Sequence, residues 1–134
     1  MNDLWEYTGE PLEEPPEGMI GFVYMITNLI SGRRYIGRKN FWTTKTTQKK
    51  GKKTKHKVET DWKYYYSSSD ELQADVLKLG TGNFKREILY LASMKSTMNY
   101  METKLIFVNG CLESDDWYNR WVSCKINKRT LKKL

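Results

Sequence analysis

Two short runs of strand-forming residues, separated by a tight turn, constrain the fold of this chain more than any other feature. Residues 21–27, with the sequence GFVYMIT, are rich in β-branched and aromatic side chains and predict a well-buried strand. Residues 28–32 supply turn chemistry, and residues 33–37 predict a returning strand. The sequence therefore predicts an antiparallel hairpin against which the rest of the domain packs.

The register expected for this hairpin places two tyrosines on one face. With a four-residue turn at residues 29–32, Ile26 pairs with Tyr35, and Tyr24 pairs with Gly37. Gly37 then leaves the Tyr24 ring without a bulky neighbour. Arg38 and Lys39 follow Gly37 directly in the sequence, and their positive charge favours the ionised form of a nearby phenol. We therefore expect a tyrosine here that accepts a proton from water. The alternative is that both tyrosines are ordinary strand residues.

After the hairpin, the sequence predicts a basic loop, a helix, a third strand and a second helix. The loop is expected at residues 38–57, the first helix at 71–79, the strand at 83–91 and the second helix from residue 93 or 96 to about 109. Ser69 or Asp70 can cap the first helix, and Gly80 and Gly110 can end the two helices. The predicted fold class is α+β, with a small central three-stranded antiparallel sheet flanked by helices.

The two ends of the chain differ in charge from the domain between them. Residues 1–19 carry six acidic side chains, no basic one and three prolines, and they predict an extension without regular structure. Residues 20–124 form the expected domain, and residues 125–134 form a basic tail. The acidic extension is interpreted as a solubilising arm, and the alternative is a segment that lies over the basic surface as a mimic of a polyanion.

Basic charge is concentrated in one part of the sequence. The formal net charge is +7, and residues 33–63 alone carry twelve Lys and Arg side chains against two acidic ones. Segregation of this kind favours a polyanionic partner such as a nucleic acid. The alternative is a solvated lysine loop that only aids solubility.

Composition excludes several kinds of catalytic site. One histidine, His56, and two cysteines are too few for a disulfide framework, a four-ligand zinc site or histidine-based chemistry. Catalysis must then depend on Tyr, Lys, Arg, Asp or Glu. No apolar run approaches the ~20 residues that a membrane span requires, and the acidic N-terminus lacks the layout of a signal peptide. We therefore expect a protein with no membrane partner, located in the cytoplasm.

The two tyrosine-containing tripeptides resemble the signature of the GIY-YIG nuclease superfamily. Residues 22–24 (FVY) and residues 35–37 (YIG) are separated by ten residues, as in that family's hairpin. Glu102, on the second expected helix, fits the family's single metal ligand, and Asn119 fits an Asn that is frequent near the end of the domain. The resemblance covers roughly residues 20–122. Within the family, the chain is similar to phage-encoded, homing-endonuclease-like (Seg-type) members, which implies a mobile genetic element.

The resemblance implies a metal-dependent DNA endonuclease that hydrolyses phosphodiester bonds, in a bacterial or phage-infected host cell. Six site residues follow from it: Tyr24, Tyr35, Arg38, Lys63, Glu102 and Asn119. Tyr24 would be the general base with aid from Tyr35, and Arg38 and Lys63 would hold the scissile phosphate. Glu102 would bind Mg²⁺ (or Mn²⁺), and Asn119 would orient the phosphate or a neighbouring side chain.

The chain departs from the family pattern at two places. Phe22 stands where the first tripeptide has Gly, and Lys45 stands near the position where many members carry an Arg. Many members also carry a His or Tyr one helical turn after that Arg. The candidates for these two positions are Arg38 or Lys63 for the Arg, and Tyr65, Tyr66 or His56 for the His or Tyr.

The basic residues of the hairpin and loop are the expected DNA-binding set. They are Arg33, Arg34, Lys39, Lys45, Lys49, Lys50, Lys52, Lys53, Lys55 and Lys57. Lysines in a flexible segment contact phosphates and give affinity and salt dependence, but little reading of base sequence. Site specificity, if present, would come from a few loop contacts, from oligomerisation or from a partner.

Three functional hypotheses remain open at this point. The first is the endonuclease, which nicks one strand as a monomer, or cuts both strands as a homodimer or in two binding events. The second is a catalytically inactive DNA-binding module of the same fold. The third is a structural or inhibitory protein whose basic face binds an acidic protein.

Overall fold

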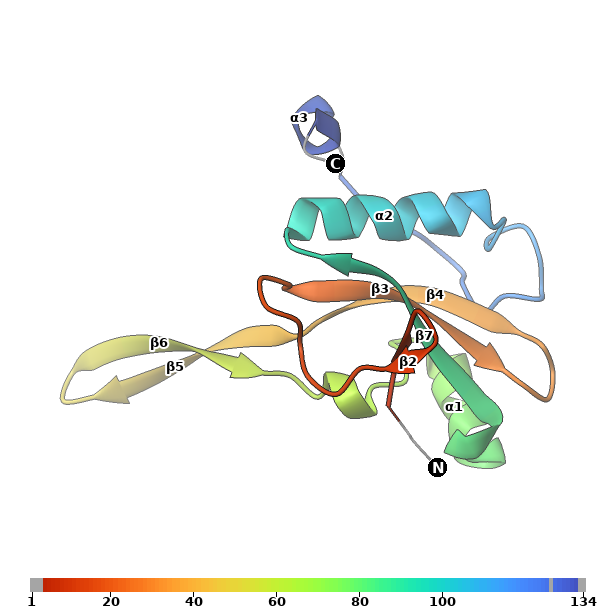
Figure 1. Ribbon diagram of the computed structural model, residues 1–134, viewed down its shortest axis with the longest axis horizontal. Helices are drawn as coiled ribbons and strands as arrows, with labels where there is room; N and C mark the ends of the chain where they lie inside the picture. Colours follow the sequence, from red (N-terminus) through yellow and green to blue (C-terminus); the bar gives the residue numbers. More distant parts are fainter. Residues whose placement is uncertain (1–3, 126, 133–134) are drawn as a thin grey trace.

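A mixed sheet forms the centre of the computed structural model, which describes residues 4–125 and 127–132 (Figure 1). Within these residues the sheet has five strands in the order β2-β1-β7-β3-β4. Their bounds are β1 (Glu6–Tyr7), β2 (Glu10–Pro11), β3 (Gly21–Asn28), β4 (Arg34–Asn40) and β7 (Phe84–Ala92). β1 runs parallel to β7, and the other neighbouring pairs are antiparallel. The α+β class is confirmed, but the expected three-stranded sheet is wrong, because two short strands extend it beyond β7.

Helices cover both faces of this sheet (Figure 1). α1 (Asp70–Leu79) lies on one face and α2 (Lys95–Val108) on the other. Alternate residues of β3 point to opposite faces, so Tyr24 belongs to the hydrophobic cluster that includes Leu72 of α1, whereas Val23 belongs to the cluster that includes Met98 of α2. This two-sided burial explains why residues 21–27 are apolar almost without interruption.

The first helix has the ends that the sequence predicts. The side chain of Ser69 accepts a hydrogen bond from the backbone N–H of Leu72 at 3.2 Å, which caps the helix N-terminus. Gly80 follows its last residue with a φ of 89°, a conformation that favours glycine. Short 3₁₀ helices lie on either side, at η1 (Trp62–Tyr64) and η2 (Thr81–Asn83).

Residues near the N-terminus belong to the core, contrary to the sequence-based expectation. The Trp5 side chain is fully buried, and its indole N–H donates to the Trp62 carbonyl oxygen at 2.6 Å. Its ring lies 5.1 Å from that of Phe22 and 4.9 Å from that of Tyr24. The prediction that residues 1–19 lack regular structure is wrong for β1 and β2, because burial of one large aromatic side chain holds this segment against the sheet.

The predicted basic loop is instead an ordered hairpin, which we call the basic ribbon. It consists of β5 (Trp42–Lys49) and β6 (Lys52–Glu59), and it extends away from the rest of the molecule (Figure 1). Its turn residues Lys50 and Gly51 have φ values of 53° and 76°, as a two-residue type I′ turn requires. Because residues 43–57 are exposed on both faces, they show no hydrophobic periodicity, which is why the sequence predicted a loop.

The chain ends in a short helix, α3 (Lys128–Lys132), within the basic tail. Residues 1–3, 126, 133 and 134 of the two expected terminal segments lie outside the described residues. Among the helices that the structure describes, none is long and apolar enough to cross a membrane.

Candidate active site

The two tyrosines of the hairpin lie on one face, in the register that the turn length predicts. Tyr24 pairs with Gly37 and Ile26 with Tyr35, and the two phenol rings lie 6.2 Å apart between centroids. A Cβ atom added at Gly37 would lie 2.5 Å from the Tyr24 hydroxyl oxygen and 2.8 Å from Cε2 of Tyr35. Glycine at this position therefore makes room for both rings.

This close approach predicts a steric cost for Gly37→Ala. We expect the substitution to lower the free energy of unfolding by about 1–3 kcal/mol, because the buried Tyr24 ring has little space in which to move. Urea denaturation measures this value. In a Tyr24→Phe background, which lacks the hydroxyl nearest to the new methyl group, the loss should be smaller. An equal loss in both backgrounds would contradict a clash with that hydroxyl.

A cavity of about 760 Å³ opens beside these tyrosines, at the β4 edge of the sheet. Its lining comes from the hairpin, the start of α1, the middle of α2 and residues 118–123. Five of the six predicted site residues line it, namely Tyr24, Tyr35, Arg38, Glu102 and Asn119. The sixth, Lys63, is not among the described residues that line the cavity. Its ammonium group lies 5.8 Å from the Trp62 ring centroid.

Arg38 and Glu102 form an ion pair in the lining of the cavity. Arg38 follows the second tyrosine tripeptide on β4, and its Nη1 atom donates to Oε1 of Glu102 on α2 at 2.9 Å. The Glu102 side chain is 14% exposed, and burial raises the pKa of its carboxyl while Arg38 opposes that shift. The partner of Glu102 is therefore Arg38, the predicted phosphate-binding cation.

Burial dominates the acidity of both tyrosines. Tyr24 is 1% exposed, and desolvation raises the pKa of its hydroxyl well above the usual value, with further upward effects from Tyr65 and Tyr35. Desolvation also raises the pKa of Tyr35, although its Ser68 hydrogen bond and Arg38 act in the opposite direction. The expected stabilisation of a phenolate by neighbouring cations is therefore wrong for the ground state. Both side chains are neutral phenols near pH 7.

Asn119 joins the C-terminal segment to the hairpin. Its Oδ1 atom accepts a hydrogen bond from the Ile36 backbone N–H at 3.1 Å, and its Nδ2 atom donates to the Ile36 carbonyl oxygen at 2.8 Å. Two further backbone bonds connect the same segment to Arg34, one from the Arg34 N–H to the Asp116 carbonyl and one from the Tyr118 N–H to the Arg34 carbonyl. Asn119 thus holds the β4 edge in place, and its contact with phosphate stays a prediction.

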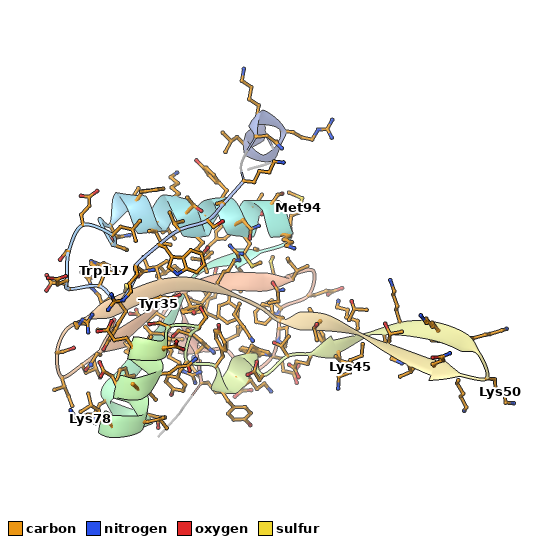
Figure 2. All side chains as sticks on the ribbon, turned by 180° about the vertical axis from the view of Figure 1, so that it is seen from behind. Tyr35, Lys45, Lys50, Lys78, Met94 and Trp117 are labelled. Carbon is orange, nitrogen blue, oxygen red and sulfur yellow. The ribbon has the colours of Figure 1, made fainter. Side chains whose placement is uncertain are left out.

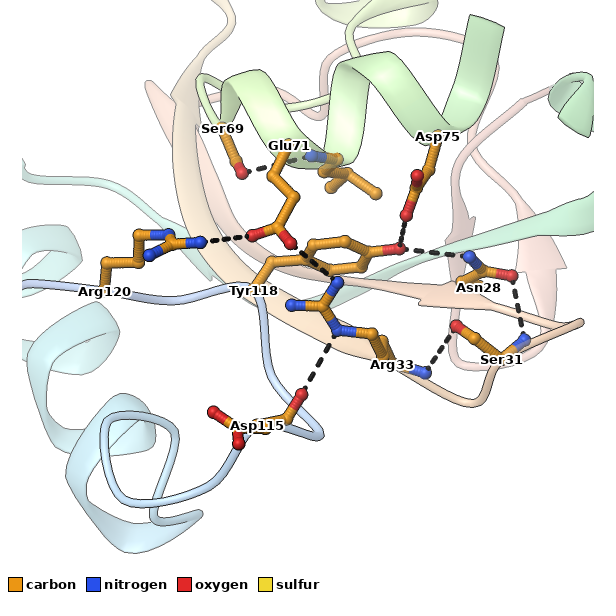
Figure 3. A network of polar contacts seen from close by, with 10 residues as sticks. Asn28, Ser31, Arg33, Ser69, Glu71, Asp75, Asp115, Tyr118 and Arg120 are labelled. Carbon is orange, nitrogen blue, oxygen red and sulfur yellow. Dashed lines mark hydrogen bonds and ion pairs between the residues drawn. The ribbon is translucent and has the colours of Figure 1, made fainter. Parts of the chain in front are cut away.

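A polar network fixes the neighbouring wall of the cavity (Figure 3). Glu71, at the start of α1, accepts from Arg33 and from Arg120, each at 2.9 Å. The Tyr118 hydroxyl donates to Asp75 at 2.6 Å and accepts from the Asn28 amide at 3.0 Å. Because these bonds tie α1, the hairpin turn and residues 118–120 together, they set where the cavity wall stands.

The predicted DNA-binding residues fall into two groups. Three of them have partners within the domain: Arg33 binds Glu71, the Arg34 guanidinium lies 4.3 Å from the Trp117 ring centroid, and Lys39 binds Asp61 at 2.7 Å. The other seven are the lysines of the basic ribbon, all of which are exposed. Figure 2 shows two of them, Lys45 and Lys50, on the ribbon and away from Tyr35 and Trp117. Direct contact of either group with DNA stays a prediction.

Two of the polar residues that line the cavity, Arg120 and Ser68, were not singled out from the sequence, and Tyr65, an open candidate, packs against Tyr24 without being among the described lining residues. The Ser68 hydroxyl lies 3.4 Å from that of Tyr35. The Tyr65 ring packs edge-on to that of Tyr24, with centroids 6.1 Å apart. Arg120 could have been found as the neighbour of Asn119, whereas nothing in the sequence singles out Ser68.

Residues 5–122 match the family model described as "Putative endonuclease segE, GIY-YIG domain". The chain belongs to this GIY-YIG family. The resemblance inferred from the two tripeptides, Glu102 and Asn119 is therefore confirmed at the level of the family. A search of curated proteins and a search of solved structures found no match.

The match also bears on the limits of the GIY-YIG domain. It begins at Trp5, which packs against the first GIY-YIG tripeptide, and it ends just after Asn119. It spans the basic ribbon as well, so the ribbon lies within the matched part of the chain.

The residues of the GIY-YIG cavity fit a divalent cation held by one protein ligand. Among the described residues, no three His, Cys, Asp or Glu side chains gather into a metal-binding group. Glu102 is a mostly buried carboxylate that lines a cavity with room for water and for substrate oxygens. Mg²⁺ keeps much of its hydration shell and is often bound through one or two carboxylates together with phosphate oxygens, so this set of donors suits it.

Proposed function

We propose that this GIY-YIG chain is a metal-dependent DNA endonuclease that hydrolyses phosphodiester bonds in the cavity at the β4 edge. The observation that carries the proposal is that two phenols, a guanidinium and a carboxylate, from Tyr24, Tyr35, Arg38 and Glu102, line one cavity in a chain of this family. Phosphodiester hydrolysis requires an oriented water, positive charge near the phosphate and help for the departing oxygen. These side chains supply the first two requirements.

In this proposal the tyrosines act on the attacking water. Tyr24, neutral at rest, first loses its hydroxyl proton to solvent in the cavity. The phenolate then accepts the proton of the attacking water as the bond to phosphorus forms, with Tyr35 holding the water from the other side. Burial raises the pKa of Tyr24, so its phenolate is a stronger base than one in water but is present in only a small fraction of molecules near pH 7; the cleavage rate should therefore rise with pH.

Arg38 and Arg120 are proposed as the residues that hold the scissile phosphate. Arg38 lines the cavity and pairs with Glu102. Arg120 joins the lining from the C-terminal segment, residues 118–123. Arg120 takes the place that the sequence assigned to Lys63. A guanidinium suits this role because its planar set of donors matches two phosphate oxygens at once.

Glu102 is proposed as the ligand of Mg²⁺ or Mn²⁺. When bound, such an ion supplies positive charge that stabilises the phosphorane-like transition state and the departing oxygen. Burial raises the pKa of the Glu102 carboxyl, and the Arg38 contact opposes that shift and so favours the charged form. The proposed role of Arg38 before substrate arrives is therefore to orient Glu102 and to favour its carboxylate.

Incubation with supercoiled plasmid tests the proposal directly. We expect conversion to open circles or linear DNA with Mg²⁺ and none with EDTA. Open circles indicate a nicking enzyme, and linear DNA indicates cleavage of both strands by a homodimer or by two events. Sequencing the ends then measures site specificity. DNA retention without any Mg²⁺-dependent product would favour the inactive binding module instead.

Tyr24→Phe is expected to lower the single-turnover cleavage rate by at least about 100-fold, because it removes the proposed proton acceptor. The fold should persist, with the free energy of unfolding changed by no more than about 1.5 kcal/mol, since only one hydroxyl is lost. Tyr64→Phe is the matched control, because Tyr64 is 81% exposed. Cleavage by the Tyr24 variant at the unmodified rate would remove this residue from the mechanism.

A further inference from the structure

The basic ribbon presents lysines on both of its faces. Directly opposed residues of an antiparallel pair share a face, so the register places Lys53, Lys55 and Lys57 on one side. Lys45, Lys49 and Lys52 lie on the other side. Two contacts confirm this division: Lys57 lies over the Trp42 ring at 4.6 Å, and Thr47 bonds to His56 at 2.8 Å. Positive charge therefore surrounds the ribbon.

Uncharged side chains complete the exposed surface of the ribbon. Residues 43–58 include seven lysines and no acidic residue. Thr44, Thr46 and Gln48 lie opposite the first row of lysines, in register with Lys57, Lys55 and Lys53. Hydroxyl and amide groups of this kind form hydrogen bonds with base edges, whereas lysines pair with phosphates.

The base of the ribbon is fixed to the domain that carries the cavity. Phe41 and Trp62, which flank the ribbon, are both fully buried and lie 4.9 Å apart between ring centroids. The Thr60 hydroxyl donates to the Asn40 carbonyl at 2.6 Å, and the Thr60 N–H donates to the Phe41 carbonyl at 2.9 Å. The ribbon therefore has a defined direction relative to Arg38, on the strand that leads into it.

A flat acidic surface needs cations on only one face of a ribbon, whereas a groove with phosphates along both walls uses cations on both. The major groove of B-DNA is about 12 Å wide and admits a two-stranded β-ribbon without deformation of the duplex, whereas the minor groove, at about 6 Å, must be widened or bent before strands can enter it. We propose that the basic ribbon inserts into the major groove of duplex DNA next to the cavity. This inference rests on the proposed function, because it takes DNA as the substrate.

Groove insertion assigns separate roles to the ribbon side chains. The lysines on the two faces contact the phosphates of the two strands that border the groove. The row formed by Thr44, Thr46 and Gln48 shares a face with Lys53, Lys55 and Lys57 but lies on β5, so entry by the β5 edge places this row nearest to the base edges. The duplex is thereby held in one orientation while the scissile phosphate enters the cavity.

The test compares two variants of the full chain that lose the same charge. The ribbon variant replaces four lysines with glutamine, two from each face: Lys45, Lys49, Lys53 and Lys55. The control variant makes the same change at four exposed lysines outside the ribbon: Lys78, Lys95, Lys104 and Lys125. Circular dichroism and urea denaturation check that both remain folded.

Binding to a 30-base-pair DNA duplex is measured in EDTA across a range of salt concentrations. We expect the ribbon variant to bind at least about 10-fold more weakly, with a slope of log affinity against log salt smaller by about 3 to 4, since each lost phosphate contact removes about 0.9. The control variant should lose less than about 1 from this slope. Equal losses in the two variants would overturn the inference.

Two modified duplexes distinguish groove insertion from general charge attraction. In double-stranded RNA the major groove is deep and narrow, so the ribbon substitutions should weaken RNA binding far less than DNA binding. Bulky substituents on pyrimidine C5 fill the major groove of DNA, so they should weaken binding of the unmodified protein but not of the ribbon variant. Equal losses on RNA and DNA, or no effect of the substituents, would overturn the proposal.

These binding results are independent of cleavage. If the ribbon behaves as expected but the unmodified protein leaves plasmid intact with Mg²⁺, the proposed function fails and the groove inference stands. If plasmid is cut and the ribbon variant binds like the control variant, the groove inference fails and the proposed function stands.

Discussion

Glu102→Gln is expected to lower Mg²⁺-dependent cleavage of supercoiled plasmid by at least about 100-fold while leaving DNA affinity nearly unchanged. Glutamine has almost the same shape as glutamate but no negative charge, so it is a poor ligand for Mg²⁺. The amide oxygen can still accept the hydrogen bond from Arg38, which keeps that wall of the cavity in place. The loss therefore reports the missing charge.

Two further measurements make this result specific. Glu10→Gln is the control, because Glu10 is exposed on β2, away from the residues that line the cavity. Mn²⁺ binding in the absence of DNA can be monitored by electron paramagnetic resonance. Glu102→Gln should bind Mn²⁺ more weakly than the unmodified protein, whereas the control should bind it with unchanged affinity. Unchanged cleavage and unchanged Mn²⁺ binding together would exclude Glu102 as the metal ligand.

Trp5→Ala should lower the free energy of unfolding by about 3–5 kcal/mol, the range typical of a fully buried large aromatic residue. Trp5 contacts the rings of Phe22 and Tyr24, and its indole N–H is bonded to the Trp62 carbonyl. The substitution would leave a cavity next to the first tyrosine tripeptide and an unpaired carbonyl group. Urea denaturation of the full chain measures the loss.

Trp121→Ala is the matched control for this prediction. Trp121 is 75% exposed, so its removal should change the free energy of unfolding by no more than about 0.5 kcal/mol. If Trp5→Ala costs as little as the control, residues near the N-terminus do not belong to the core. A large loss would instead show that residues 1–19, which the sequence interpretation left outside the domain, help to stabilise the face of the sheet on which Tyr24 lies.

The hairpin and α1 could be predicted because their signals are local. The register that brings Tyr24 opposite Gly37 follows from turn length and the two-residue period of strands. Ser69 and Gly80 mark the two ends of α1 by their own hydrogen-bonding and conformational preferences. Each of these inferences needs only residues close together in the chain.

The basic ribbon and the strands β1 and β2 could not be predicted in the same way. The ribbon buries neither face, so its strands lack the alternation of apolar and polar residues by which a half-buried strand is detected. β1 and β2 are two residues long, and the burial of Trp5, a contact with residues far along the chain, holds them. Propensity carries little information about either element.

The sequence by itself determined the family, the hairpin register and the residue types available for chemistry, because tripeptides, turn length and composition are properties of the chain. Only the tertiary structure decided how those residues act on one another. It paired Arg38 with Glu102, left Lys63 out of the cavity lining and enclosed Tyr24, whose pKa rises although cations follow it in sequence. The reason is physical: pKa values and ion pairs depend on burial and on distances through space, which adjacency in the sequence does not fix.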